Sequence, residues 1–143
     1  MSGKAARVIL PWLFSAFTMF GLSYFWHGVV LTDLQRIEYP FGLFFLLASL
    51  LYVSLAAALL LLIRFVDIKM GNALKGLLIG GLLGFLVYLI AFTLGISFQP
   101  NPEIKHLALD FTWQMLEQGV GGFVCGLVYQ GVQNFQARPK PLE

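Results

Sequence analysis

The sequence predicts an all-α integral membrane protein, with four transmembrane helices in an antiparallel up-down bundle. Three observations lead to this fold class. The 143 residues are 59% hydrophobic and only 11% charged, whereas an ordinary soluble domain is about 25% charged. Four apolar stretches are each long enough to cross a hydrocarbon core, which takes about 20 helical residues. No segment alternates apolar and polar residues as barrel strands do, so helices must satisfy the backbone hydrogen bonds in lipid.

The four predicted spans form a single domain over residues 1–143 and leave only short connections. They cover residues 8–31, 41–63, 76–98 and 107–135. Short connections favour a bundle in which the first and fourth spans can be neighbours. The first apolar run is too long for a secretory signal, so we expect it to remain as a span. The final Leu142-Glu143 resembles a cloning remnant and is left out of the functional reasoning.

Basic residues predict the orientation of the bundle. Of the nine Lys and Arg residues, only Arg36 and Lys105 fall on one side of the predicted spans. The other side holds Lys4, Arg7, Arg64, Lys69, Lys75, Arg138 and Lys140. The positive-inside rule therefore places both termini and the 64–75 connection in the cytoplasm. The compact chain and this charge bias favour a bacterial inner membrane.

Several function classes lack support in the sequence. A net charge of +2 gives no nucleic-acid footprint. A single cysteine, Cys125, excludes an internal disulfide framework and a zinc site with several cysteines; we interpret it as a small packing residue. The sequence has no nucleophile elbow, His-Glu-x-x-His pair, phosphate loop or dinucleotide fingerprint. An enzyme is therefore the less favoured class, and the expected partners are the lipid bilayer and a homodimer or larger membrane complex.

Glycines at helical spacing predict close helix packing. Gly76, Gly80 and Gly84 lie four residues apart in the third span, and Gly122 and Gly126 repeat this spacing in the fourth. Small residues let helix backbones approach each other closely in a membrane. The spacing favours contacts between spans of one chain, and a homodimer seam is the alternative.

A polar stripe on the fourth span provides the main functional candidate. At about 100° per residue, His106, Asp110, Trp113 and Glu117 share one face, and Gln114 flanks it. Glu117 lies about 15 Å along the span from its outer end, which is about half of a 30 Å core. A charged Asp at a helix centre costs about 2.5–3.5 kcal/mol to insert, and Glu should be similar. An ionisable group at this depth is a functional candidate, and the alternative is a neutral Glu117 that only joins helices.

The first span offers a complementary set of side chains. Ser23, Tyr24 and His27 share a face in its outer half. If the first and fourth spans touch, these residues and the polar stripe would surround one outward-opening pocket. Asp110 has an alternative role, because a carboxylate near a helix N-terminus is favoured by the helix dipole. The predicted ligand-binding set is Glu117, Asp110, His106, His27, Trp113, Gln114, Tyr24 and Ser23.

Hydroxyls elsewhere in the spans have a simpler interpretation. Ser49, Tyr52 and Ser54 in the second span are expected to be satisfied by backbone carbonyls. The third span adds Thr93 and Ser97 in its outer half. For the second span, bonding to carbonyls is thus the more usual role, and contact with a ligand is the less usual one.

Three functional hypotheses remain open. In the first, Glu117 is the essential group of a pocket that binds or moves a small polar ligand, cation or proton. In the second, the protein is a non-catalytic scaffold subunit whose glycine faces dock partner helices. In the third, His27 and His106 hold a metal or haem iron. The third is the least favoured, because the histidines are 79 positions apart and have no metal-ligand spacing, so no cofactor is expected.

Overall fold

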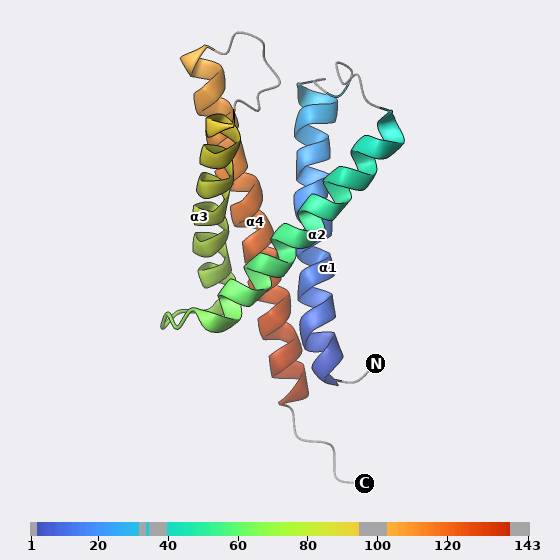
Figure 1. The fold of residues 1–143 in the computed structure, drawn as a ribbon. Helices are drawn as coiled ribbons and strands as arrows, with labels where there is room; N and C mark the ends of the chain where they lie inside the picture. Colours follow the sequence, from blue (N-terminus) through green and yellow to red (C-terminus); the bar gives the residue numbers. More distant parts are fainter. Residues whose placement is uncertain (1–2, 32–33, 35–39, 95–102, 138–143) are drawn as a thin grey trace.

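Four long helices run up, down, up and down, so the first turn of α1 and the last turn of α4 lie at the same end of the bundle (Figure 1). The computed structural model describes residues 3–31, 34, 40–94 and 103–137. Its elements are α1 (Gly3–Ser23), the π-helix η1 (Tyr24–Val30), α2 (Phe41–Phe65), α3 (Asn72–Thr93) and α4 (Ile104–Gln136). The described residues contain no strand. The all-helical class predicted from the sequence is confirmed.

Three of the helices are long and apolar enough to cross a membrane. They are α1 continued by η1 (Gly3–Val30), α2 and α3. The fourth helix, α4, has 33 residues and is the longest, but it is less apolar than the others.

The helices extend beyond several predicted boundaries, because helical hydrogen bonding continues past the apolar core. The first helix begins at Gly3 and α3 begins at Asn72, each a turn before its predicted span. Side chains at the ends of the bundle support this extension. Arg7 donates to Oε1 of Gln136 (2.6 Å), and the Gln136 amide donates to the carbonyl of Gly3. Residues 95–98 of the third predicted span lie outside the described residues, as do residues 142–143.

The central position of α4 explains its composition. It contacts α1, α2 and α3, and its contact with α3 is the most extensive in the molecule. The side that faces the other helices is made of polar and small residues: Glu117, Gln118, Gly119, Gly121, Gly122, Cys125 and Gly126. The opposite side presents Leu109, Leu116, Phe123 and Leu127, all exposed, at spacings of seven, seven and four. A helix packed against three others needs only this one apolar stripe on its outer side.

Glycines bring α3 and α4 together backbone to backbone. A Cβ atom added at Gly76 would overlap the carbonyl of Gly122, and one at Gly80 would overlap the carbonyl of Gln118. At Gly84 the carbonyl oxygen of Gln114 would lie 2.5 Å away, and a Cβ at Gly126 would overlap the carbonyl of Asn72. We call this contact the glycine seam. It uses the predicted packing glycines within one chain, so this face is not free for a second copy.

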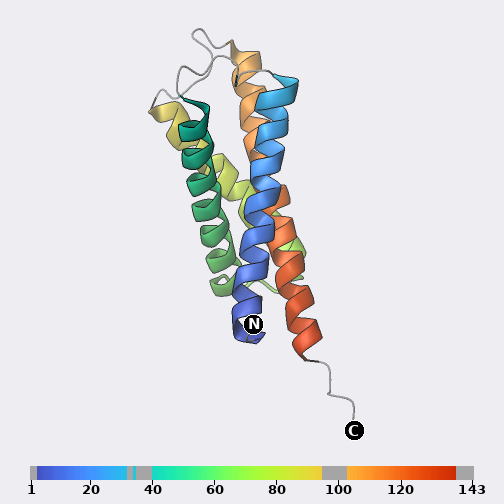
Figure 2. The ribbon, with the colours of Figure 1, turned by 90° about the vertical axis from the view of Figure 1, so that its right-hand side faces the viewer.

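The second helix packs differently, because it crosses the bundle obliquely in the view of Figure 1. In the view turned by 90° it runs alongside α1, and α3 is the helix that slants (Figure 2). It starts beside the η1 end of α1 and reaches α3 and α4 more sparsely than it reaches α1. The core between α1 and α2 is made of side chains, namely Ala16, Met19, Tyr52, Ala56 and Leu59. The Trp12 indole donates to the carbonyl of Val53 across this contact (2.8 Å).

Candidate functional site

The candidate site is centred on two adjacent polar side chains of α4 that are fully enclosed. Glu117 and Gln118 are both 0% exposed. The Gln118 amide donates a long hydrogen bond (3.4 Å) to Oε1 of Glu117. The second carboxyl oxygen, Oε2, has no hydrogen-bond partner among the described residues, and neither has Oε1 of Gln118. A buried polar group without a hydrogen-bond partner lowers the free energy of unfolding by about 1–3 kcal/mol. These atoms are therefore either a source of strain or part of a binding site.

Three further side chains bring donor groups close to the Glu117 carboxyl. They are Tyr52 from α2, Ser23 from the end of α1 and Trp113 from the preceding turn of α4. None of them forms a complete hydrogen bond with Oε2. We call Glu117, Gln118, Tyr52, Ser23 and Trp113 the Glu117 cluster. Tyr52 lies near the middle of α2, the most apolar helix, so the cluster is far from both ends of that helix.

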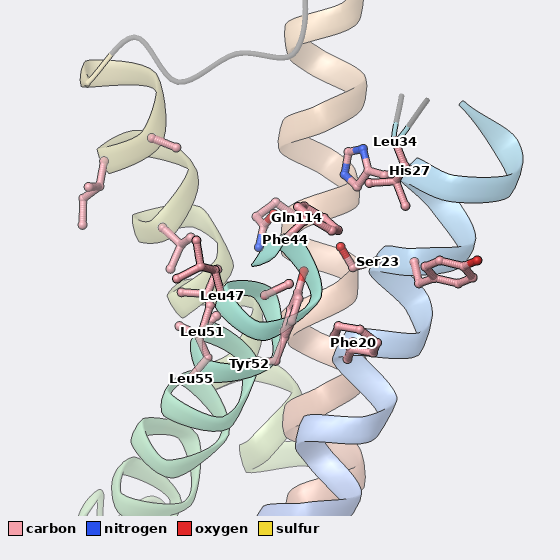
Figure 3. A pocket seen from close by; sticks show the side chains of 15 residues that line it. Phe20, Ser23, His27, Leu34, Phe44, Leu47, Leu51, Tyr52, Leu55 and Gln114 are labelled. Atoms are coloured by element: carbon pink, nitrogen blue, oxygen red, sulfur yellow. The ribbon is translucent and has the colours of Figure 1, made fainter. Parts of the chain in front are cut away.

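A cavity of about 490 Å³ lies against this cluster, and Ser23 and Tyr52 belong to both (Figure 3). Its size falls within the range of small-molecule sites, about 300–1,000 Å³. The polar lining comes mainly from α1, η1 and α4, with Tyr52 from α2. The remaining wall is apolar and comes mostly from α2 and α3: Phe44, Leu47, Ala48, Leu51, Leu55, Val87, Ile90 and Ala91. The cavity therefore has one polar and one apolar wall.

The predicted ligand-binding residues divide into two groups. Ser23, Tyr24, His27 and Gln114 all line the cavity. His27 points into it from η1, a π-helical segment (Figure 3). Such segments are rare and are frequently found at functional sites. These four residues, together with Glu117 behind them, are the part of the predicted set that the structure brings together.

The other predicted residues do not line the cavity. Asp110 lies within electrostatic range of Tyr88 on α3, whose hydroxyl donates to the carbonyl of Leu107 (2.9 Å). Trp113 stacks on Trp26 with ring centroids 4.2 Å apart. This stack joins η1 to α4, so the predicted contact between the first and fourth spans is present. Nδ1 of His106 and the two indole nitrogens of the stack are buried and have no hydrogen-bond partner within the part of the chain that the structure describes.

Sequence reasoning missed two members of the cluster. Tyr52 was expected to be satisfied by a backbone carbonyl, yet its side chain lies beside Glu117. Gln118 falls to one side of the predicted stripe and is nevertheless fully buried. A signal for Tyr52 was present, because it is the only tyrosine in a span whose other polar residues are two serines. By contrast, Ser54 and Thr93 bond the carbonyls four residues before them, as such residues usually do in helices.

The described residues contain no group of three or more His, Cys, Asp or Glu side chains that could hold a metal ion. Cys125 is free and fully buried in the core between α2 and α4. No observation on these residues favours the metal or haem hypothesis.

Comparison with protein-family models, curated proteins and solved structures gives no match for this chain. The function is therefore argued from the site alone.

Proposed function

We propose that this is a small membrane protein that binds a ligand in the cavity between its helices, with Glu117 as the essential ionisable group behind the polar wall. The observation that carries this proposal is the coincidence of a cavity with a fully buried carboxyl whose Oε2 has no hydrogen-bond partner among the residues that the structure describes. A ligand group placed between Ser23 and Tyr52 would complete the hydrogen bonding of the cluster.

In this proposal α4 also crosses the membrane, as the fourth span. Its support is the exposed apolar stripe that ends at Leu127 and the close packing of its other side on α3. At 1.5 Å per residue its 33 residues reach about 50 Å, enough for a 30 Å core with a turn or more at each end. The basic residues place both termini in the cytoplasm, and a bacterial inner membrane fits the chain best.

The cavity chemistry favours a ligand with an apolar body over a bare cation or proton. Two of its contributing helices, α2 and α3, present only apolar side chains apart from Tyr52. A hydrated cation would gain nothing from such a wall, because losing its water there is costly. Binding of a molecule with one polar group is the function that this arrangement serves.

The scaffold hypothesis receives less support. It required glycine faces open to partner helices and a Glu117 able to pair with a partner's charge. The glycine seam is filled by the chain itself, and Glu117 is 0% exposed. A partner could reach neither feature without separating α3 from α4 or opening the cluster.

Native mass spectrometry of the protein purified in mild detergent tests the proposal. We compare the wild type with Ala48→Trp, which fills the cavity, and with Leu50→Trp, a control on the same helix at an exposed position outside the cavity lining. We expect a bound small molecule of defined mass on the wild type and the control, and its loss from Ala48→Trp. Glu117→Gln should weaken its retention by about tenfold, equivalent to one charged hydrogen bond. Identical spectra for all four proteins, or no adduct on any of them, would reject the proposal.

A further inference from the structure

We infer that the ligand reaches the cavity sideways from the bilayer, between α2 and α3, and is a single-chain amphiphile with an uncharged hydroxyl-bearing headgroup. This inference rests on the proposed function and names the ligand class of the same site. It follows from where the cavity opens, how its walls differ and which charges are missing from it.

The cavity opens on the side of the bundle. Three of its lining residues are more than half exposed: Leu47 (57%) and Leu51 (52%) on α2, and Ile90 (61%) on α3. They define what we call the mouth. The connection between α2 and α3 is at the opposite end, so the two helices diverge toward the mouth (Figure 1). Since both helices are apolar enough to span a membrane, the mouth faces hydrocarbon.

The two walls match the two parts of an amphiphile. A hydrocarbon chain that enters at the mouth meets only apolar side chains of α2 and α3 before it reaches Tyr52. The far wall then offers the Ser23 and Tyr52 hydroxyls and the Gln114 amide (Figure 3). These groups both donate and accept hydrogen bonds, as a hydroxyl ligand requires.

The charges at the cavity select against a phosphate headgroup. No Lys or Arg is among the described residues that line it, and its one basic side chain is the imidazole of His27. Recognition of phosphate in proteins relies on Arg, Lys or free backbone amides, whereas here the Glu117 carboxyl lies behind the wall, beside Ser23 and Tyr52. The described part of the chain gives the Oε2 atom of that carboxyl no hydrogen-bond donor, and a ligand hydroxyl would supply one.

The experiment uses a monoacylglycerol with a photoactivatable group near the end of its acyl chain and the full-length protein in lipid nanodiscs. The competitors are unlabelled monoacylglycerol and lysophosphatidate with the same acyl chain, which adds only the phosphate. We expect saturable labelling at the mouth residues, displaced by monoacylglycerol at a concentration at least tenfold lower than by lysophosphatidate. Tyr52→Phe should weaken labelling about fivefold, because it removes one hydroxyl from the polar wall.

Two variants that fill the cavity serve as negative controls for binding. Two are used because one of them could lose labelling through a folding defect alone. Ala48→Trp on α2 and Ala91→Trp on α3 should both abolish saturable labelling, while Leu50→Trp keeps it. Labelling spread over all exposed helix faces and unchanged in both variants would overturn the inference, as would equal competition by lysophosphatidate. A dimer joined by a disulfide between cysteines introduced at Leu47 would show a helix of a second copy as the occupant of the mouth and would also overturn it.

Failure of this inference and failure of the proposed function give different results. If the mass-defined adduct on the wild type is lost in Ala48→Trp but monoacylglycerol does not label the mouth, the cavity binds a ligand of another class. If no adduct depends on the cavity and no labelling is saturable, both proposals are rejected.

Discussion

The two halves of this bundle are held together in opposite ways. The glycine seam joins α3 to α4 through backbone atoms, with no space for a Cβ at Gly76 or Gly80. The second helix meets its neighbours through long side chains, crosses the bundle obliquely and leaves a 490 Å³ cavity between itself, α1 and α3. In lipid there is little hydrophobic force between helices, so close backbone packing provides much of the attraction. The rigid seam therefore allows the other half to remain open enough for a ligand.

The strongest way to break this contrast is to add one methyl group at the seam. Gly80→Ala would drive its Cβ into the carbonyl of Gln118, a backbone atom that cannot move away. We expect the free energy of unfolding, measured by detergent titration in mixed micelles, to fall by about 3 kcal/mol or more. Gly81→Ala is the matched control, because the nearest atom to its Cβ is 3.9 Å away. The control should gain up to about 1 kcal/mol from helix propensity, and equal losses in both variants would contradict the seam.

Gly121 tests the effect of an added Cβ at a place where the atoms in the way belong to a flexible side chain and not to the backbone. A Cβ added there would overlap the side chain of Met19 on α1. We expect Gly121→Ala to cost about 1–2 kcal/mol, less than Gly80→Ala, because Met19 can change its rotamer. In a Met19→Ala background the cost of Gly121→Ala should disappear, giving a coupling of about 1 kcal/mol or more in a double-mutant cycle. Simple additivity of the two substitutions would show that the clash is absent.

The ring stack between Trp26 and Trp113 joins η1 to α4. Trp26→Phe replaces the indole by a smaller phenyl ring and so weakens its stacking on Trp113, whose ring centroid lies 4.2 Å away. We expect a loss of about 0.5–1.5 kcal/mol in the free energy of unfolding, together with a smaller near-ultraviolet circular dichroism signal. Phe25→Leu, at a neighbouring exposed position, should change neither quantity by a comparable amount.

The smallest effect on the free energy of unfolding is expected in the cavity, and it contrasts directly with the effect at the glycine seam. Ala48→Trp adds a large ring to the cavity, where there is space for it. We expect the free energy of unfolding to change by no more than about 1 kcal/mol, although one methyl at Gly80 costs far more. A loss as large as that of Gly80→Ala would mean that the cavity half is packed as tightly as the seam.

Much of the fold was predictable because it depends on local patterns. The apolar run of residues 41–63 gave α2 almost to its ends, Phe41 and Phe65. The four-residue spacing of Gly76, Gly80 and Gly84 identified the face of α3 that packs on a neighbour. Burial of Glu117 followed from the cost of exposing a carboxyl to lipid. In each case the relevant information lies within one helix.

The composition of the site was less predictable, because it depends on how helices rotate and tilt against each other. Helical periodicity placed Asp110, Trp113 and Glu117 on one face, yet Asp110 is near Tyr88 on α3 while Glu117 is near Tyr52 on α2. A face wide enough to touch two neighbours serves two different contacts. The oblique path of α2, which creates the cavity, is set by side-chain packing that no periodicity encodes.

Fluorine NMR on the protein with 3-fluorotyrosine in place of tyrosine tests the enclosed Glu117 cluster most directly. The Tyr52 resonance is assigned from its loss in Tyr52→Phe and then compared between the wild type and Glu117→Gln. Because the Glu117 carboxyl lies beside the Tyr52 ring, we expect a clear change in chemical shift at Tyr52, while Tyr129 and Tyr88 keep theirs. An unchanged Tyr52 resonance in Glu117→Gln would show that the carboxyl lies elsewhere, and the cluster, the cavity's polar wall and the proposed function would all be contradicted.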